Sequence, residues 1–302
     1  MNEAKAFSPG HITGFFQVCD QSRDPLLKGS RGAGFSTSLG VATKVSAKKS
    51  TKNHVEILTP GENVKSASVS EHVVRTLLTH VDGNYEVHVE HDIKIPVGCG
   101  LGSSGAGSLS LALALNKVLD LKMPYLKAAQ IAHAAEIKCK TGLGTVIDAT
   151  FGGFQIRVEP GAPGIGETEP ILASEDHVAV CLSFGKIPTS EILASKVARQ
   201  RINELGGDLV EELVRHPSIH DFMKLSRRFA EHLGLVTVRM RKVLQETDRI
   251  GLECSMAMLG ETIFSVVGRD QIEEILSIFC KYAPSKRSVI VTDIDFIGAR
   301  LL

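Results

Sequence analysis

A glycine-rich segment between two predicted regular elements carries the clearest chemical signal in the chain. Residues 96–108 read Pro-Val-Gly-Cys-Gly-Leu-Gly-Ser-Ser-Gly-Ala-Gly-Ser. Alternating apolar residues over 87–95 predict a strand before this segment, and the apolar run 109–119 predicts a buried helix after it. Glycines leading into a helix let the backbone approach a phosphate, which the free N–H groups and the helix dipole stabilise. The segment therefore predicts a phosphate-binding loop, with the hydroxyls of Ser103 and Ser104 beside the phosphates.

Three known phosphate-binding loops are candidates for this segment. A Walker-type loop is excluded because no lysine follows the glycines. The dinucleotide fingerprint G-x-G-x-x-G matches, but it also requires a second strand that ends near an acidic residue about 20 positions on. Asp120 has nearly that spacing, yet it ends the predicted helix, and residues 126–138 again have a helical pattern. The remaining candidate resembles the P-x-x-x-G-L-G-S-S-A loop of the GHMP kinases, with only the last alanine changed, to Gly105. This resemblance implies an ATP site formed by Pro96, Gly98, Gly100, Leu101, Gly102, Ser103, Ser104 and Gly105.

Three other segments are similar to GHMP kinase motifs. Residues 8–16 resemble the opening motif, in which the family's lysine is His11 here. Residues 132–136 precede a Gly-x-Gly turn at 142–144, and Glu136 matches the family's magnesium carboxylate. Residues 256–267 take the place of the third motif, although only Gly260 remains of its glycine cluster. The resemblance implies that Ser104 and Glu136 hold Mg²⁺, which binds oxygen and often takes only one or two protein ligands. A helix cap at Ser104 and a solvated charge at Glu136 remain the alternatives from the residues alone.

The combination of segments 8–16, 29–35, 141–144 and 295–300 resembles one family of GHMP kinases, the archaeal pantoate kinases. That resemblance implies transfer of the γ-phosphoryl group of ATP to the 4-hydroxyl of pantoate, in coenzyme A synthesis. It implies an α/β (α+β) fold, with an N-terminal α/β domain containing a left-handed crossover (residues 1–172) and a ferredoxin-like C-terminal domain (residues 173–302). A homodimer is compatible with it. Two alternatives remain: a mevalonate- or homoserine-type GHMP kinase, and an inactive nucleotide-binding protein.

The group that accepts the hydroxyl proton is less well defined by the sequence. Many GHMP kinases carry an aspartate about seven residues before a Gly-Gly pair, and this position is Thr145 here. Asp148 would lie one turn further along a helix and on the same face. It is either the replacement or a structural hydrogen-bonding residue. Phosphoryl transfer depends mainly on positioning and electrostatics, so a missing base affects the rate first.

A small anionic acceptor with two hydroxyls requires a cation and several neutral donors. Arg31, between glycines, and Arg157, after the Gly-Gly turn, are both candidates for a carboxylate. His133 lies one turn before Glu136 on the same predicted helix. Each such residue alone is more often a surface or packing residue, and their joint match to the family supports a site. The full substrate-binding prediction is His11, Ser30, Arg31, His133, Arg157 and Thr189.

Composition agrees with a cytoplasmic enzyme. The chain of 302 residues has 43% hydrophobic residues, enough for a large core and two domains. Its 34 basic and 34 acidic residues balance, which gives no indication of a nucleic-acid or anionic-membrane partner. The longest apolar run is too short to cross a bilayer, and the N-terminus has no signal-peptide core. The six cysteines contain no Cys-x-x-Cys pair, which favours a reducing compartment over a zinc site or disulfide scaffold.

The remaining pattern predicts alternating strands and helices. Proline and glycine over 159–175 predict a loop or domain boundary. Beyond it, strands are predicted at 178–182, 262–267 and 288–293, and helices at 192–205, 209–214, 220–233, 238–247 and 271–282. This alternation predicts α/β layers in both halves.

Overall fold

Two β-sheets with helices packed against them make up the computed structural model, which describes residues 2–59, 67–187 and 189–302, without the side chains of Thr189 and Ser190. The first sheet has seven strands in the order β11-β1-β2-β4-β3, with β5 paired to β2 and β6 paired to β5. Its strands are β1 (Asn2–Cys19), β2 (Gly29–Ser50), β3 (His54–Leu58), β4 (Asn84–Ile93), β5 (Phe154–Glu159), β6 (Glu167–Ile171) and β11 (Arg300–Leu301).

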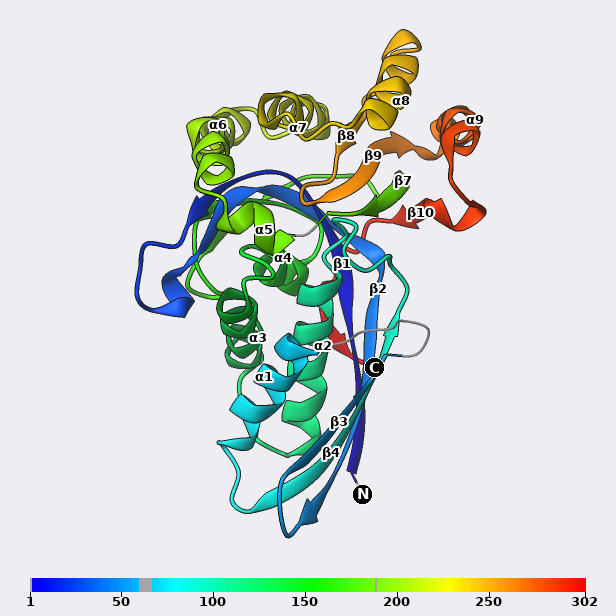
Figure 1. The fold of residues 1–302 in the computed structure, drawn as a ribbon. Helices are drawn as coiled ribbons and strands as arrows, with labels where there is room; N and C mark the ends of the chain where they lie inside the picture. Colours follow the sequence, from blue (N-terminus) through cyan, green and yellow to red (C-terminus); the bar gives the residue numbers. More distant parts are fainter. Residues whose placement is uncertain (1, 60–66, 188) are drawn as a thin grey trace.

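Four helices accompany the first sheet. They are α1 (Ser68–Leu78), α2 (Ser103–Val118), α3 (Tyr125–Cys139) and α4 (Thr145–Phe151). In Figure 1, α1, α2 and α3 lie together on one side of the long strands β1–β4. Strands β3 and β4 are parallel, and α1 lies between them in the sequence, so this segment forms a crossover connection. Helix α2 is apolar on nearly all sides because it packs against β1, β2, α1 and α3.

The second sheet has four antiparallel strands in the order β10-β7-β9-β8. Its strands are β7 (His177–Lys186), β8 (Ser255–Met256), β9 (Gly260–Gly268) and β10 (Val289–Asp293). Helices α6–α9 lie on the outer side of this sheet, at the top of Figure 1. The helices of this half are α5 (Thr189–Ala194), α6 (Lys196–Arg215), α7 (Ile219–Leu233), α8 (Val238–Arg249) and α9 (Ile272–Tyr282).

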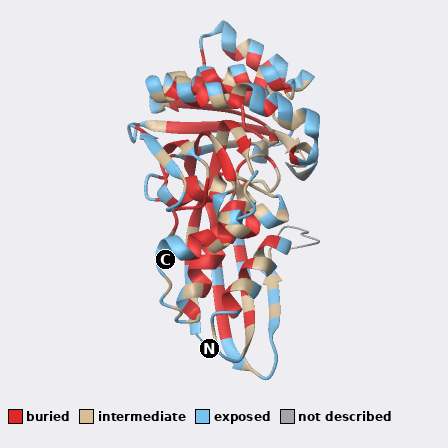
Figure 2. Ribbon diagram, turned by 90° about the vertical axis from the view of Figure 1, so that its left-hand side faces the viewer, coloured by how far each residue is buried: buried red, intermediate tan, exposed pale blue. Residues whose placement is uncertain are grey.

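One hydrophobic core joins the two halves of the chain. Phe15 and Phe35 of the first sheet pack with Phe222 of α7 and Phe264 of β9. The Phe35 and Phe264 ring centroids are 5.7 Å apart. Figure 2 shows buried residues continuing from the long strands into the layer beneath the upper helices. The two halves therefore stabilise each other through this shared core.

The predicted division between residues 172 and 173 separates strands β1–β6 from β7–β10. The C-terminus then returns to the first sheet, where Leu301 pairs with Ala6 of β1. A domain described by its packing would thus include these last residues with the N-terminal half. The division itself stays a prediction.

Most predicted elements are present, and two differ. The helices predicted at 192–205 and 209–214 are instead the short α5 followed by α6, which continues through Gly206 and Gly207. Glycine is required there because a Cβ on Gly206 would lie 2.1 Å from the Phe16 carbonyl oxygen, where α6 packs on β1. Part of the loop predicted at 159–175 is strand β6, which pairs with β5.

Candidate active site

A cavity of about 440 Å³ opens between the phosphate-binding loop and residues from both halves of the chain. Its lining includes the N-terminus of α2, the turn 140–145, Arg157 of β5 and residues 258–259 before β9. Of the sequence-predicted residues, it brings together His11, Ser30, Gly98, Gly100, Gly102, Ser103, Ser104, Gly105, Glu136, Thr145 and Arg157. The loop and three of the six proposed acceptor-binding residues, His11, Ser30 and Arg157, thus face one space.

The phosphate-binding loop takes the conformation that its glycines allow. Gly98, Gly100 and Gly102 have φ values of 77°, 83° and 71°, in the left-handed region. Gly102 is the N-cap of α2 and has no side chain to satisfy the first N–H groups of the helix. These donors, with Ser103 and Ser104 in the first turn, form a site suited to phosphate oxygens.

Residues 256–267, where only Gly260 remains of the third motif's glycines, pack against the phosphate-binding loop. A Cβ on Gly260 would lie 2.0 Å from the carbonyl carbon and oxygen of Cys99, so only glycine allows this approach. Thr262 Oγ1 donates a hydrogen bond to the same Cys99 oxygen, at 2.7 Å. The Met258 N–H donates to the Thr13 carbonyl, at 3.0 Å. The single glycine that remains in this motif is therefore the one that contacts the loop.

Glu136 lies at one end of the cavity, on α3. Its side chain is buried, and Oε1 accepts hydrogen bonds from Ser104 Oγ at 2.6 Å and Thr141 Oγ1 at 2.7 Å. Burial raises the pKa of Glu136, and the two hydroxyl donors act in the opposite direction. A Cβ on Gly142 would lie 2.4 Å from Oε2, so the glycine of the Gly-x-Gly turn leaves room for this oxygen.

These donors fit a hard cation that keeps most of its shell for phosphate and water. Among the described residues, no group of three or more His, Cys, Asp or Glu side chains could hold a metal ion. One carboxylate and one hydroxyl beside a phosphate-binding helix are instead what Mg²⁺ uses at nucleotide sites. Ser104 and Glu136, which both line the cavity and hydrogen-bond each other, are the residues that could hold it.

A buried charged cluster lies beside the cavity, which His11 and Arg157 line and Asp148 does not. His11, Asp148 and Arg157 are each at most 1% exposed. Arg157 Nη1 forms an ion pair with Asp148 Oδ2, and His11 Nε2 lies 2.7 Å from the same oxygen. Three polar atoms of this cluster have no hydrogen-bond partner within the described part of the chain: His11 Nε2, Asp148 Oδ1 and Arg157 Nε. Native proteins rarely bury such atoms unpaired, so the cluster fits a surface that is completed by a ligand.

Arg157 and Ser30 approach each other over the Gly-x-Gly turn. A Cβ on Gly144 would lie 2.6 Å from both Arg157 Nε and Ser30 Oγ. The glycine thus leaves a space into which a guanidinium and a hydroxyl point together. Such a pair can bind a carboxylate, because arginine presents a planar set of donors.

Arg31 and His133 contact partners outside the cavity lining, which also lacks the predicted residues Pro96, Leu101 and Asp148. Arg31 donates from Nε to the Val158 carbonyl at 2.7 Å and pairs with Glu211 of α6, away from the cavity lining. His133 donates from Nε2 to the Lys28 carbonyl at 2.9 Å, and burial lowers its pKa. The side chain of Thr189, the first residue of α5, lies outside the described residues.

The structure also places residues in the cavity that the sequence argument missed. They include Thr13, Phe16, Lys140, Thr141 and Lys186. Thr13 and Thr141 belong to segments already matched to the family. Their closeness in sequence to His11 and Glu136 could therefore have predicted that they line the cavity. Lys186 comes from the end of β7, and nothing local in its sequence marks it.

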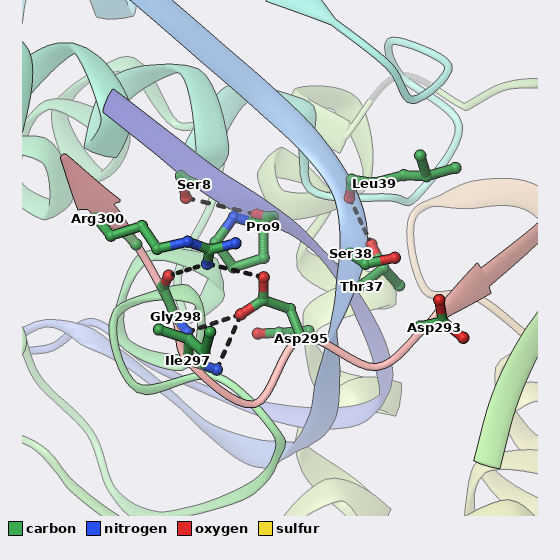
Figure 3. A network of polar contacts seen from close by, with 12 residues as sticks. Ser8, Pro9, Thr37, Ser38, Leu39, Asp293, Asp295, Ile297, Gly298 and Arg300 are labelled. Atoms are coloured by element: carbon green, nitrogen blue, oxygen red, sulfur yellow. Dashed lines mark hydrogen bonds and ion pairs between the residues drawn. The ribbon is translucent and has the colours of Figure 1, made fainter. Parts of the chain in front are cut away.

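The C-terminal segment 295–300 clamps α4 rather than lining the cavity. Figure 3 shows the Asp295 carboxylate accepting bonds from the Ile297 and Gly298 N–H groups and from Arg300. The Asp295 carbonyl accepts from the Gly153 N–H at 2.7 Å, and the Ala299 N–H donates to the Ala149 carbonyl at 2.9 Å. Because α4 carries Thr145, which lines the cavity, this segment holds in place a helix that borders the site.

Comparison with known proteins gives consistent matches. Residues 67–153 match the family model described as GHMP kinases N terminal domain. The chain is 34% identical over 272 residues to a pantoate kinase of Methanocaldococcus jannaschii, covering 90% of this chain and 96% of that protein. It is 36% identical to a pantoate kinase of Thermococcus kodakarensis, covering 89% of each. A solved structure titled "Phosphotransferase related to CoA biosynthesis pathway" superposes with a TM-score of 0.86 at 31% identity, covering 99% of this chain and 98% of that one.

Within the described part of the chain, helices that are both long and apolar enough to cross a bilayer do not occur.

Proposed function

The chain belongs to the pantoate kinase family of the GHMP kinases, and from that premise we propose that it transfers the γ-phosphoryl group of ATP to the 4-hydroxyl of pantoate. The observation that carries this proposal is the single cavity in which the phosphate-binding loop faces Arg157 and Ser30. A phosphate donor and a small carboxylate acceptor would meet there. Phosphoryl transfer is mainly a problem of positioning and charge, and both walls of the cavity supply these.

On the donor side, ATP would place its phosphates against the N-terminus of α2. The first N–H groups of the helix, the Ser103 hydroxyl and the left-handed glycines Gly98 and Gly100 support this placement. Cys99, within the loop, is held by Thr262 and Gly260, which keeps the loop rigid before the ligand arrives. Preorganised donors stabilise developing charge without the cost of reorganisation.

Ser104 and Glu136 would hold Mg²⁺, and the hydrogen bond between their side chains supports this assignment because it places both oxygens together. The ion, when bound, offsets the negative charge of the β- and γ-phosphates. The chain's own contribution is to orient the two oxygens. Thr141 fixes one side of the Glu136 carboxylate, and Gly142 leaves the other side accessible.

On the acceptor side, Arg157 would bind the carboxylate of pantoate, with Ser30 beside it. Asp148 keeps the guanidinium in place from below. Lys140 and Lys186 add positive charge to the cavity, which suits two anionic ligands. We further propose that the protein is located in the cytoplasm, where ATP and small acids are available. We also propose that it forms a homodimer, which a sedimentation measurement would test.

Release of ADP with pantoate, mevalonate and homoserine, assayed in parallel, tests this function. Turnover with pantoate alone supports it. Binding of ATP without turnover of any acceptor would instead support the inactive nucleotide-binding protein, which the replacement of the family's aspartate by Thr145 keeps under consideration.

The magnesium assignment has a separate test. We expect Ser104→Ala and Glu136→Gln each to lower kcat by about 10²–10³-fold, since each removes a group that stabilises charge in the transition state. Glu71→Gln, on the outer face of α1 where the carboxylate is 49% exposed, is the matched control. Full activity in both site variants would contradict the assignment.

A further inference from the structure

The side chains that could accept the hydroxyl proton differ in their basicity and in the contacts that they already make. Thr145 lines the cavity but carries no basic group. Glu136 is engaged by Ser104 and Thr141. Asp148 is fully buried and shared between Arg157 and His11. Histidine is the side chain that changes its charge most readily near neutral pH, and His11 is a lining residue of the cavity.

The contacts of the His11 ring fix which nitrogen carries the proton. Nε2 lies 2.7 Å from Asp148 Oδ2, and two lone pairs would repel each other at that distance, so the proton is on Nε2. Nε2 makes no hydrogen bond in this contact, so the contact with the carboxylate is electrostatic. Nδ1 therefore presents a lone pair, and it lies 3.3 Å from Thr13 Oγ1. Thr13 is half-buried and also lines the cavity.

The ring is held in one position relative to the phosphate-binding loop. A Cβ on Gly34 would lie 2.5 Å from His11 Nε2, so this glycine of β2 makes room for the ring. The backbone N–H of His11 donates a hydrogen bond to the Leu101 carbonyl at 3.0 Å, which attaches β1 directly to the loop. A proton acceptor at this place keeps a fixed distance from the bound phosphates.

The charged groups beside His11 suit a ring that takes up a proton during the reaction. Arg157 and Asp148 balance each other, so a neutral imidazole leaves the empty cluster uncharged. An imidazolium would be stabilised by the Asp148 carboxylate and by anionic ligands in the cavity. Within the described part of the chain, Gly34 of β2 and Asp148 of α4 lie against the ring, and Arg157 of β5 pairs with that same aspartate.

We propose that His11 is the terminal proton acceptor, that Thr13 relays the proton to it, and that Asp148 is its positioning residue; this rests on the proposed function. The 4-hydroxyl oxygen forms a bond to the γ-phosphorus while the bond from that phosphorus to the β–γ bridging oxygen breaks, and ADP leaves with the electron pair. The hydroxyl proton passes to Thr13 Oγ1 as the Thr13 proton passes to His11 Nδ1. Thr13 is thereby restored, His11 becomes imidazolium, and its proton is later released to water.

Substitutions at Thr13 and His11 test the relay in single-turnover assays with ATP and magnesium already bound. We expect His11→Gln to lower the rate by about 10²–10⁴-fold, the usual range for a general base. Thr13→Val, which has the same shape without the hydroxyl, should lower it at least about ten-fold, at the lower end of such effects because His11 remains. Thr13→Ser, the matched control, should stay close to the wild-type rate. ATP affinity should be nearly unchanged in all three.

The pH profile separates chemistry from structure. The wild-type rate should fall toward low pH, because a protonated His11 cannot accept another proton, and His11→Gln should lose this acid limb. Asp148→Asn should move the limb to lower pH, since the imidazolium loses its negative partner. A purely structural Asp148 would leave the limb in place.

Two outcomes would overturn the proposal: His11→Gln with the wild-type rate and profile, or equal rates in Thr13→Val and Thr13→Ser. The Thr13 pair decides alone where His11→Gln does not fold. Wild-type activity is read separately, because absence of turnover with pantoate overturns the proposed function. The relay would then be tested on whichever alcohol the enzyme does phosphorylate.

Discussion

Two buried histidine clusters in this molecule have opposite hydrogen-bonding states. His91 of β4 lies behind α2, where Nδ1 contacts Thr43 Oγ1 at 2.8 Å and Nε2 contacts Ser70 Oγ at 3.0 Å. Thr43 in turn contacts Ser110 Oγ at 2.6 Å, and Ser110 donates to the Ala106 carbonyl. Each member has a partner, so the chain of bonds closes within the protein.

The His11 cluster, in contrast, has three buried polar atoms without a hydrogen bond among the described residues and borders the cavity. A satisfied network stabilises a fold, whereas an unsatisfied one is costly unless a ligand completes it. The comparison teaches that burial alone does not distinguish a structural histidine from a functional one. The state of its hydrogen bonds does.

The largest effect is expected from removing the cation of the His11 cluster. Arg157→Met leaves the Asp148 carboxylate buried without its cation, which should lower the free energy of unfolding by about 3–5 kcal/mol. Arg157→Met combined with Asp148→Leu should recover most of that stability while activity stays lost. Urea denaturation and ADP release measure the two properties. A single variant with unchanged unfolding would show that the pair is not a buried ion pair.

The His91 cluster should instead affect how the free energy of unfolding depends on pH. Burial lowers the pKa of His91 to about 4, so the native ring is neutral while the unfolded chain takes up a proton below about pH 6.5. The unfolded state then binds more protons between these values, and stability falls as pH decreases through that window. The loss should reach roughly 3 kcal/mol near pH 4.

His91→Gln is the variant that checks the origin of this pH dependence. It should flatten the dependence of unfolding on pH between about 6.5 and 4, while kcat at neutral pH stays close to the wild-type value. A steep activity loss in this variant would remove the distinction between the two clusters.

A smaller effect is expected from the clamp beneath α4. Asp295→Ala leaves the Ile297 and Gly298 N–H groups without their acceptor, which should cost about 1–3 kcal/mol and lower kcat modestly by loosening α4. Asp293→Ala is the matched control. That aspartate is 57% exposed and pairs with Arg269, so its loss should change stability by less than about 1 kcal/mol. Equal effects from the two would contradict a clamp.

Much of the fold, and the loop and helix that line one part of the cavity, could be predicted from sequence. The glycine-rich loop and its helix depend on local conformation, which residue types specify directly. Glu136 could be placed because its helix and turn carry a recognisable spacing. The continuous α6 could not, because Gly206 is required by contact with Phe16, nearly two hundred residues earlier in the chain.

The residues proposed to bind the acceptor were harder to predict, because their positions also depend on contacts distant in the sequence. Arg31 and Arg157 look alike in sequence, each next to or near glycines, yet Arg31 pairs with Glu211 on α6 while Arg157 enters the cavity. His133 was placed on the correct helix, but it bonds to the Lys28 carbonyl. Which way a polar side chain turns depends on partners distant in the sequence. The same holds for Asp148, whose contacts with His11 and Arg157 join three separate strands and helices.

The most direct test of the proposed function identifies the product. Wild-type enzyme, ATP, magnesium and pantoate should yield a phosphomonoester whose ³¹P signal is split into a triplet by the two protons on carbon 4. A doublet would place the phosphate on the 2-hydroxyl, and a hydroxylamine-sensitive product would place it on the carboxylate. Either of these, or no product, would contradict the account.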